Sequence, residues 1–215
     1  MKELLSYSLV SFSAVFFVMD PMGLLPIFVA MTSKDTAQKR REMARRATLV
    51  AFGLLTVFAV FGSIIFKAFG ITLEAFRIAG GVLLLLMSLD MVRALPSRTR
   101  SSPEETTEGY EKDDVAIVPL AMPLLAGPGA IATVMVVASR GGSWLHTGIV
   151  IGAVGFTCAV TYLMLRAAGP LNRLFGRTGI AVLERIMGLL LAAIAVQFIA
   201  DGIAAMVAAG RAGAA

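Results

Sequence analysis

Two short segments place proline and glycine inside otherwise apolar stretches of the sequence. The first is Asp20-Pro21-Met22-Gly23-Leu24-Leu25-Pro26, and the second is Leu125-Ala126-Gly127-Pro128-Gly129-Ala130. Proline lacks a backbone N–H and its ring clashes with the carbonyl four residues earlier, so a helix that reaches either segment is broken or kinked there. The freed carbonyls and amides are too costly to leave facing lipid. They must therefore face protein, water or a ligand.

Broken helices in the middle of a membrane can bind a small charged solute. A half-helix that starts at the break has exposed amides and the positive end of its dipole, which attract a carboxylate. The carbonyl end of the preceding half-helix suits an ammonium group or a cation. The candidate solute- or ion-binding residues are Asp20, Pro21, Gly23, Pro26, Gly127, Pro128, Gly129 and Thr133. The alternative is a structural kink filled by neighbouring side chains, but matched interruptions in both halves of a chain favour a transporter's binding site.

Asp20 and Thr133 carry the polar side chains of this candidate site. At 1.5 Å per residue, Asp20 lies roughly 25 Å along the first apolar stretch, where an ionisable group is expensive and usually functional. It can take up a proton, coordinate a cation, or cap the helix by accepting hydrogen bonds from the amides after Pro21. Thr133 can direct its hydroxyl towards the same place or bond to its own helix backbone.

The composition places these segments in a membrane. Hydrophobic residues make up 58% of the chain and charged residues 15%, whereas an average soluble domain has about 45–50% and roughly 25%. Water-soluble domains and intrinsic disorder are therefore excluded. The net charge is +5, but the basic residues lie between apolar spans without interleaved aromatic residues. This favours contacts with lipid head groups over nucleic acid.

The apolar stretches predict six membrane-spanning helices, of which the first and fourth are interrupted. A hydrocarbon core of about 30 Å needs roughly 20 apolar residues in a helix. The approximate limits are 4–32, 47–69, 71–95, 115–139, 144–167 and 180–208. The N-terminal stretch has no small-x-small cleavage site, so we interpret it as a retained span rather than a signal peptide.

The distribution of basic residues predicts the orientation. Fourteen lysines and arginines fall in the three connections after the first, third and fifth spans, and five fall on the other side. Short basic loops stay in the cytoplasm, so both termini are expected outside, with the chain in the bacterial inner membrane as a multi-pass protein. Trp144 opens the fifth span, where an interfacial aromatic residue is expected.

An internal repeat is visible at a spacing of about half the chain. An offset of 107 residues aligns Pro21 with Pro128, and an offset of 108 aligns Arg77 with Arg185 at the head of a later span. Each half holds three spans, so the second half enters the membrane from the opposite side. The predicted fold is an all-α membrane protein of two inverted three-helix repeats. Its parts are repeat 1–95, cytoplasmic linker 96–114, repeat 115–208 and tail 209–215.

Glycines inside the spans predict places where helices approach closely. Three of them lie on one side of the fifth span, and three lie in the third and sixth spans: Gly148, Gly152, Gly155, Gly80, Gly81 and Gly188.

Three segments, 20–28, 77–81 and 118–131, resemble the signature segments of the MarC family of bacterial and archaeal integral membrane proteins. The resemblance covers nearly the whole chain and carries its motifs over to Asp20, Pro21, Gly23, Gly127, Pro128 and Gly129. It implies transport of small neutral amino acids such as alanine and glycine, as described for the SnatA type, and a relation to LysE-like exporters.

The expected function is secondary transport of small neutral amino acids, or similar small solutes, by alternating access coupled to protons or sodium. The expected partners are the small-molecule substrate, the coupling ion and membrane lipid, with a homo-oligomer left open. An exporter of another small solute or ion and a non-transporting scaffold or regulatory protein are the alternatives.

Enzymatic chemistry is not expected. The sequence has neither His-Glu-x-x-His nor Gly-x-Ser-x-Gly, and it lacks the Gly-x-x-x-x-Gly-Lys-Ser/Thr motif of nucleotide-binding proteins. One cysteine, Cys158, and one histidine, His146, leave no basis for a Cys- or His-rich metal cluster. No cofactor, metal or catalytic residue is therefore expected.

Overall fold

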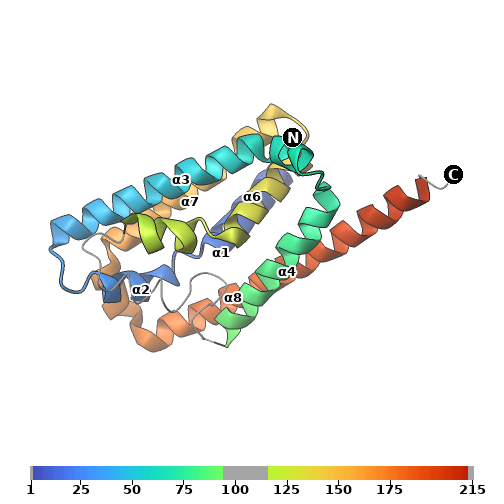
Figure 1. Cartoon of the computed structure of the whole chain (residues 1–215). Coiled ribbons are helices and arrows are strands. Elements are labelled where there is room, and N and C mark those ends of the chain that lie inside the picture. Colours follow the sequence, from blue (N-terminus) through green and yellow to red (C-terminus); the bar gives the residue numbers. More distant parts are fainter. Residues whose placement is uncertain (1, 94–115, 213–215) are drawn as a thin grey trace.

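The computed structural model describes residues 2–93 and 116–212, which form helices and no strand (Figure 1). The elements in chain order are α1 (Lys2–Met19), α2 (Leu24–Met31), α3 (Ala37–Ala68), α4 (Leu73–Val92), η1 (Ala116–Leu125), α6 (Pro128–Arg140), α7 (Trp144–Arg166) and α8 (Ala168–Ala212). The expected linker 96–114 lies outside the described residues.

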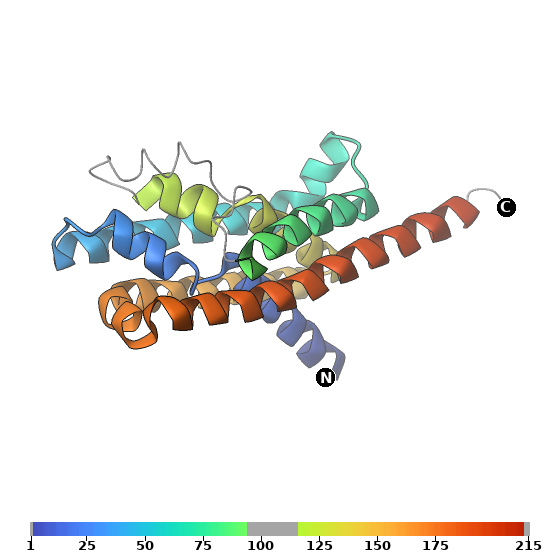
Figure 2. The same ribbon diagram turned by 90° about the horizontal axis from the view of Figure 1, so that it is seen from below.

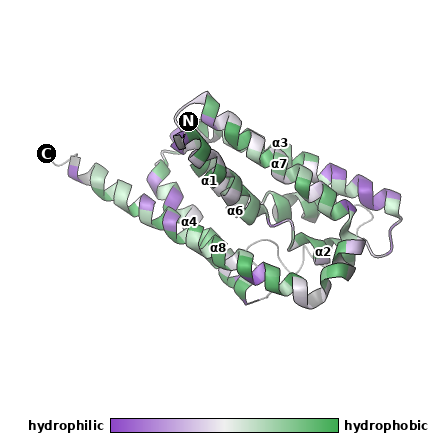
Figure 3. Cartoon of the chain, turned by 180° about the vertical axis from the view of Figure 1, so that it is seen from behind, coloured by the Kyte–Doolittle hydropathy of each residue, from purple (hydrophilic) through white to green (hydrophobic). Residues whose placement is uncertain are grey.

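Five apolar helical stretches in the described residues are long enough to cross a membrane. They are Glu3–Met31, Ala37–Gly62, Leu73–Val92, Trp144–Arg166 and Thr178–Ala209, while the apolar helix α6 is shorter. Hydrophobic residues cover most of these helices, and hydrophilic ones gather near their ends (Figure 3). The predicted all-helical membrane architecture is confirmed at this level.

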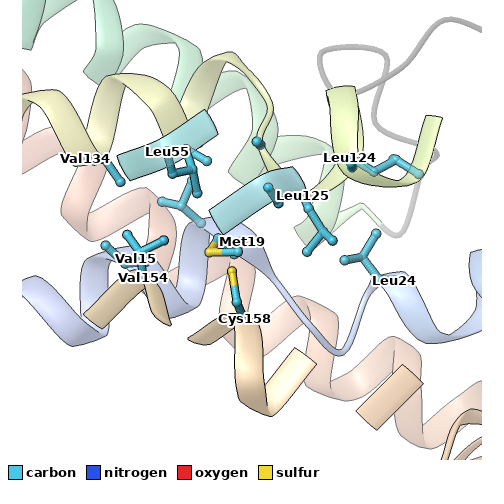
Figure 4. Packing of buried hydrophobic residues seen from close by; sticks show 14 of the residues in the cluster. Val15, Met19, Leu24, Leu55, Leu124, Leu125, Val134, Val154 and Cys158 are labelled. Atoms are coloured by element: carbon cyan, nitrogen blue, oxygen red, sulfur yellow. The ribbon is translucent and has the colours of Figure 1, made fainter. Parts of the chain in front are cut away.

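The α1–α2 segment is the central element of the bundle. In its most apolar window 61% of the residues are buried, against 33% in the corresponding windows of α3, α4 and α8. The remaining spans bury one face and leave the other to lipid, which is why large apolar side chains such as Leu49, Phe61 and Leu189 are exposed. Figure 4 shows the buried cluster in which Met19 and Leu55 pack together.

The second apolar span begins earlier than its hydropathy predicts. Instead of a loop up to residue 46, helix α3 starts at Ala37, where the Thr36 side chain accepts a hydrogen bond from the Lys39 amide at 3.3 Å. Ion pairs one turn apart, such as Asp35 with Lys39 at 2.8 Å, support the charged turns that follow. The basic residues expected in this connection therefore lie mostly on helix rather than loop.

The expected connection between the fifth and sixth spans is also helical. Helix α8 starts at Ala168, directly after α7, and is interrupted at Gly176, whose φ of 60° and ψ of −179° suit only glycine. The short first part of α8 therefore turns the chain before the long apolar part begins.

Helices α4 and α8 lie side by side, and the C-terminal end of α8 projects beyond the rest of the protein (Figures 1 and 2). Glycines make this close approach possible. A Cβ at Gly81 would lie 2.9 Å from the Ala195 carbonyl oxygen, and one at Gly188 would lie 3.1 Å from the Ser88 carbonyl oxygen. The predicted role of Gly81 and Gly188 is confirmed.

The close helix approach that we predicted at the three glycines of the fifth span is found at only one of them. A Cβ at Gly148 or Gly152 would meet nothing within 4 Å, so no neighbour approaches closely there. Only Gly155 faces another helix, with the Phe52 ring 3.3 Å from the position of its Cβ. A small side chain permits close approach but does not provide a partner helix, and the prediction for Gly148 and Gly152 was wrong.

Candidate functional site

The first break is a buried turn built around Asp20. Helix α1 ends at Met19, and Asp20 adopts a left-handed backbone conformation with φ of 45°. Its amide still donates to the Phe16 carbonyl at 3.1 Å. Its Oδ1 atom accepts a hydrogen bond from the Gly23 amide at 3.0 Å, and the residue is 1% exposed. Asp20 thus terminates α1 and caps the chain that leads into α2.

Gly23 is required by this arrangement. A Cβ at Gly23 would overlap the Asp20 carboxylate, lying 2.9 Å from its Cγ atom. Asp20 thus accepts a hydrogen bond from an amide after Pro21, as predicted, but it caps the turn 21–23 and not α2 itself, whose N-cap is Gly23. Proton uptake and cation binding stay predictions.

The second break extends back into η1, which is interrupted at two points. Within η1, Val118 and Met122 have extended backbones, with φ and ψ near those of a strand. Each precedes a proline, and the proline ring disfavours helical geometry in the preceding residue. Gly127 is also extended, and Pro128 is the first residue of α6. Proline suits this position because its missing N–H would have no partner there. The corresponding Pro21 lies three residues before α2.

Both breaks border one buried apolar cluster. Met19, Leu24, Leu125 and Ala126 are all completely buried and belong to this cluster, and Figure 4 shows Met19, Leu24 and Leu125 around its centre. Of the predicted site residues, Pro21, Gly23, Gly127 and Gly129 are buried, Pro26 is half-buried and Pro128 is exposed. Apolar side chains thus pack between the breaks. The solute pocket expected here stays a prediction.

Thr133 is one of two threonines whose buried hydroxyl has no hydrogen-bond partner among the described residues; the other is Thr56 of α3. Thr133 is completely buried, whereas Thr56 is half-buried. The hydroxyls of the buried residues Thr48, Thr157 and Thr161 donate to the carbonyl four residues earlier. The Thr133 Oγ1 atom is buried and has no hydrogen-bond partner among the described residues. Leaving such a group unsatisfied costs about 1–3 kcal/mol. The position therefore suits a polar ligand or water.

Thr133 lies one turn after Gly129 on the same face of α6. A Cβ at Gly129 would lie 3.1 Å from Leu84 of α4, so this face of α6 turns towards α4. The unpartnered hydroxyl is thus within the bundle and close to the amide end of α6. The sequence pointed to Thr133, although threonines commonly bond to their own helix backbone.

A polar cluster at the opposite end of α6 was missed by the sequence analysis. Arg140 forms an ion pair with Asp201 of α8 at 2.5 Å, and its guanidinium lies 5.1 Å from the centre of the Phe198 ring. On α1, the Tyr7 hydroxyl donates to the Val137 carbonyl at 2.8 Å. These contacts tie α6 to α8 and α1. Nothing local in the sequence signals a pair of residues 61 positions apart.

A cavity of about 320 Å³ lies beside this cluster, lined by Glu3, Tyr7, Ser11, Val137 and Arg140 among others. It borders α1 and α6 at the end of the bundle that carries the N-terminus. Its residues are distinct from those of the two breaks.

Among the described residues, five apolar helical stretches long enough to cross a membrane define a polytopic integral membrane protein. The chain belongs to the MarC family of integral membrane proteins, whose model matches residues 5–207. It is 42% identical over 199 residues to a UPF0056 membrane protein of Methanocaldococcus jannaschii, covering 93% of this chain and 97% of the relative.

Two further relatives come from other organisms. The UPF0056 membrane protein YvbG of Bacillus subtilis is 36% identical over 196 residues, covering 91% of this chain and 93% of the relative. A UPF0056 membrane protein of Archaeoglobus fulgidus is 36% identical over 200 residues, covering 93% of each chain. No solved structure matches the chain.

Proposed function

We propose that the protein is a secondary transporter that moves small neutral amino acids, or similar small zwitterionic solutes, across the membrane by alternating access. The observation that carries the proposal is the unpartnered, buried hydroxyl of Thr133, one turn into the helix that starts at the second break. A hydroxyl and the free amides of a helix start are together suited to a solute carboxylate. The resemblance to SnatA-type members supports a small neutral amino acid as the substrate.

The proposed architecture is a pair of inverted repeats with six spans. In it, η1 and α6 together form the fourth, broken span. In Figure 1, α2 leads away from the buried centre in one direction and α6 in the opposite direction, which is the relation that inverted repeats require. The proposed location is the bacterial inner membrane with both termini outside.

The apolar packing between the breaks suggests how access is controlled. In the proposed cycle the described conformation is a closed one, in which Met19, Leu24 and Leu125 separate the two half-helix ends. Movement of α2 or α6 then exposes the Thr133 hydroxyl and the first amides of α6. The Asp20 carboxylate carries the coupling proton or sodium ion in this cycle. Export of another small solute or ion uses the same site, whereas a scaffold or regulatory role leaves the Thr133 hydroxyl without a purpose.

The test is uptake of labelled alanine by the purified protein in liposomes, with an imposed proton or sodium gradient. The proposal expects uptake that Thr133→Val reduces about tenfold or more, because a hydrogen bond to a charged group contributes roughly 1.5–3 kcal/mol. Thr157→Val is the matched control, since its hydroxyl only donates to the Ala153 carbonyl.

Stability measurements separate loss of binding from loss of fold. Thr133→Val removes an unsatisfied buried hydroxyl, so its melting temperature in detergent should equal or exceed that of the wild type. Uptake no faster than in protein-free liposomes, for alanine, glycine and serine under both gradients, would contradict the proposed function. Equal uptake by Thr133→Val and the wild type would remove Thr133 from the site.

A further inference from the structure

A second cavity lies at the end of the bundle remote from the N-terminus. It has a volume of about 180 Å³ and lies between α2, α3, α7 and α8. Three arginines, Arg40, Arg41 and Arg166, line it together with apolar residues that include Phe28 and Leu165. None of the described residues that line this cavity is acidic.

These arginines lack the ion pairs that two other basic residues near the start of α3 form. Lys39 pairs with Asp35 at 2.8 Å, and Arg46 pairs with Glu42 at 2.5 Å. Within residues 2–93 and 116–212, the structure gives no ion pair to Arg40, Arg41 or Arg166. Three positive charges thus converge on one cavity with no carboxylate among the described residues that line it, an arrangement that attracts an anion.

The backbone around the cavity adds to its positive potential. The first residues of two helices line it, Ala37 of α3 and Ala168 of α8. The amides at the start of a helix and the positive end of its dipole both favour an anion. The carbonyl end of α7, at Leu165 and Arg166, also borders the cavity and offsets part of this effect, so the arginines are the main source of positive charge.

The position of the cavity indicates the source of the anion. Arg166 is the last residue of the apolar span Trp144–Arg166, so the cavity lies where hydrocarbon gives way to water. Leu163, one turn earlier, is 58% exposed and provides an apolar surface for an acyl chain. Arginine-rich cavities between membrane helices at this depth suit the head groups of anionic lipids.

We propose that this cavity binds the phosphate group of an anionic phospholipid, with Arg40 and Arg166 as its principal donors. Arg40 is half-buried and comes from α3, whereas Arg166 comes from the end of α7. One phosphate held by both therefore links the start of the second span to the corner between α7 and α8. The site is separate from the two breaks and does not depend on what the protein transports.

Native mass spectrometry of the delipidated full-length protein in neutral detergent tests this proposal. The probes are phosphatidylglycerol and phosphatidylcholine with identical acyl chains. The wild type should retain one phosphatidylglycerol in preference to phosphatidylcholine. The variant Arg40→Gln/Arg166→Gln should bind phosphatidylglycerol about tenfold or more weakly, as expected for the loss of charge-assisted hydrogen bonds.

The matched control is Arg45→Gln/Arg46→Gln, which removes the same charge from exposed positions of α3 outside the cavity. It should bind phosphatidylglycerol as the wild type does. A second readout is the melting temperature, which phosphatidylglycerol should raise in the wild type and in the control but not in Arg40→Gln/Arg166→Gln. Single Arg166→Gln serves the same comparison if the double variant fails to fold.

Two results would overturn the proposal. One is equal binding of the two lipids by the wild type, and the other is equal loss of phosphatidylglycerol from both double variants. Displacement of phosphatidylglycerol by millimolar inorganic phosphate would overturn the lipid assignment and make the free anion the occupant.

Discussion

The carboxylate of Asp20 accepts a hydrogen bond from the amide of Gly23 at 3.0 Å, inside a turn in which Asp20, Pro21 and Gly23 are buried. The contact is possible because Asp20 adopts a left-handed backbone conformation and because Gly23 has no side chain. The break between α1 and α2 is therefore a specified structure with its own capping residue.

Replacing Gly23 by alanine should destabilise the protein. The new Cβ would overlap the Asp20 carboxylate and displace it from its cap, which costs about 1–2 kcal/mol. The measurement is the melting temperature of the detergent-purified protein. Gly152→Ala is the control, since a Cβ there meets nothing within 4 Å and alanine is the better helix former. Equal melting temperatures for Gly23→Ala and the wild type would contradict the role of this turn.

Substitutions at Asp20 should separate its capping role from the role of its charge. Asparagine caps helices about as well as aspartate and tolerates a left-handed backbone, so Asp20→Asn should fold with nearly unchanged stability. Asp20→Ala should lose about 1 kcal/mol or more, because it lacks the cap. If the carboxylate couples transport to an ion, Asp20→Asn should lose gradient-driven alanine uptake. Unchanged uptake in this variant would dismiss the coupling role.

The ion pair between Arg140 and Asp201 should contribute to the docking of α6 against α8. A double-mutant cycle with Arg140→Gln and Asp201→Asn should give a coupling energy of about 1 kcal/mol, because both side chains are partly exposed. Thermal unfolding in detergent at two salt concentrations provides the measurement. If the loss of stability in the double variant equals the sum of the losses in the two single variants, the pair does not stabilise the interface.

Gly81→Ala should separate α4 from α8. Its Cβ would lie 2.9 Å from the Ala195 carbonyl oxygen and 3.2 Å from the Ile199 amide nitrogen, and backbone atoms cannot rotate away. The expected loss is about 1–3 kcal/mol, typical of overpacking. Gly148→Ala, which fills open space on α7, should leave the melting temperature unchanged or raise it. A variant Gly81→Ala as stable as this control would show that the contact tolerates a shift of the helices.

The positions of the helix breaks and most spans could be predicted because their causes are local. A proline inside a helical stretch, such as Pro21 or Pro128, interrupts the helix through its own backbone chemistry. Gly81 and Gly188 permit close packing because they have no side chain. The start of α3 at Ala37 could not be predicted from hydropathy, because a side-chain cap and ion pairs one turn apart stabilise those turns instead.

Contacts between residues that are distant in the chain could not be predicted from the sequence. Arg140 and Asp201 are far apart along the chain, and hydropathy carries no information on which charged residues meet. For Thr133, sequence rules favoured a bond to its own helix backbone, as the other buried threonines make. The missing bond became visible only in the packed bundle, where Thr133 is the completely buried member of two threonines, with Thr56, whose hydroxyls lack a partner.

Trp144, at the start of α7, is 79% exposed and is the only tryptophan of the chain. Excitation at a wavelength that only indole absorbs therefore reports on one side chain at a known end of one span, in a place where indole rings commonly settle at the lipid surface. Its emission can be quenched by brominated lipids to measure depth, and by iodide added to one side of sealed vesicles to determine which way the chain crosses the bilayer. No label or cysteine needs to be introduced.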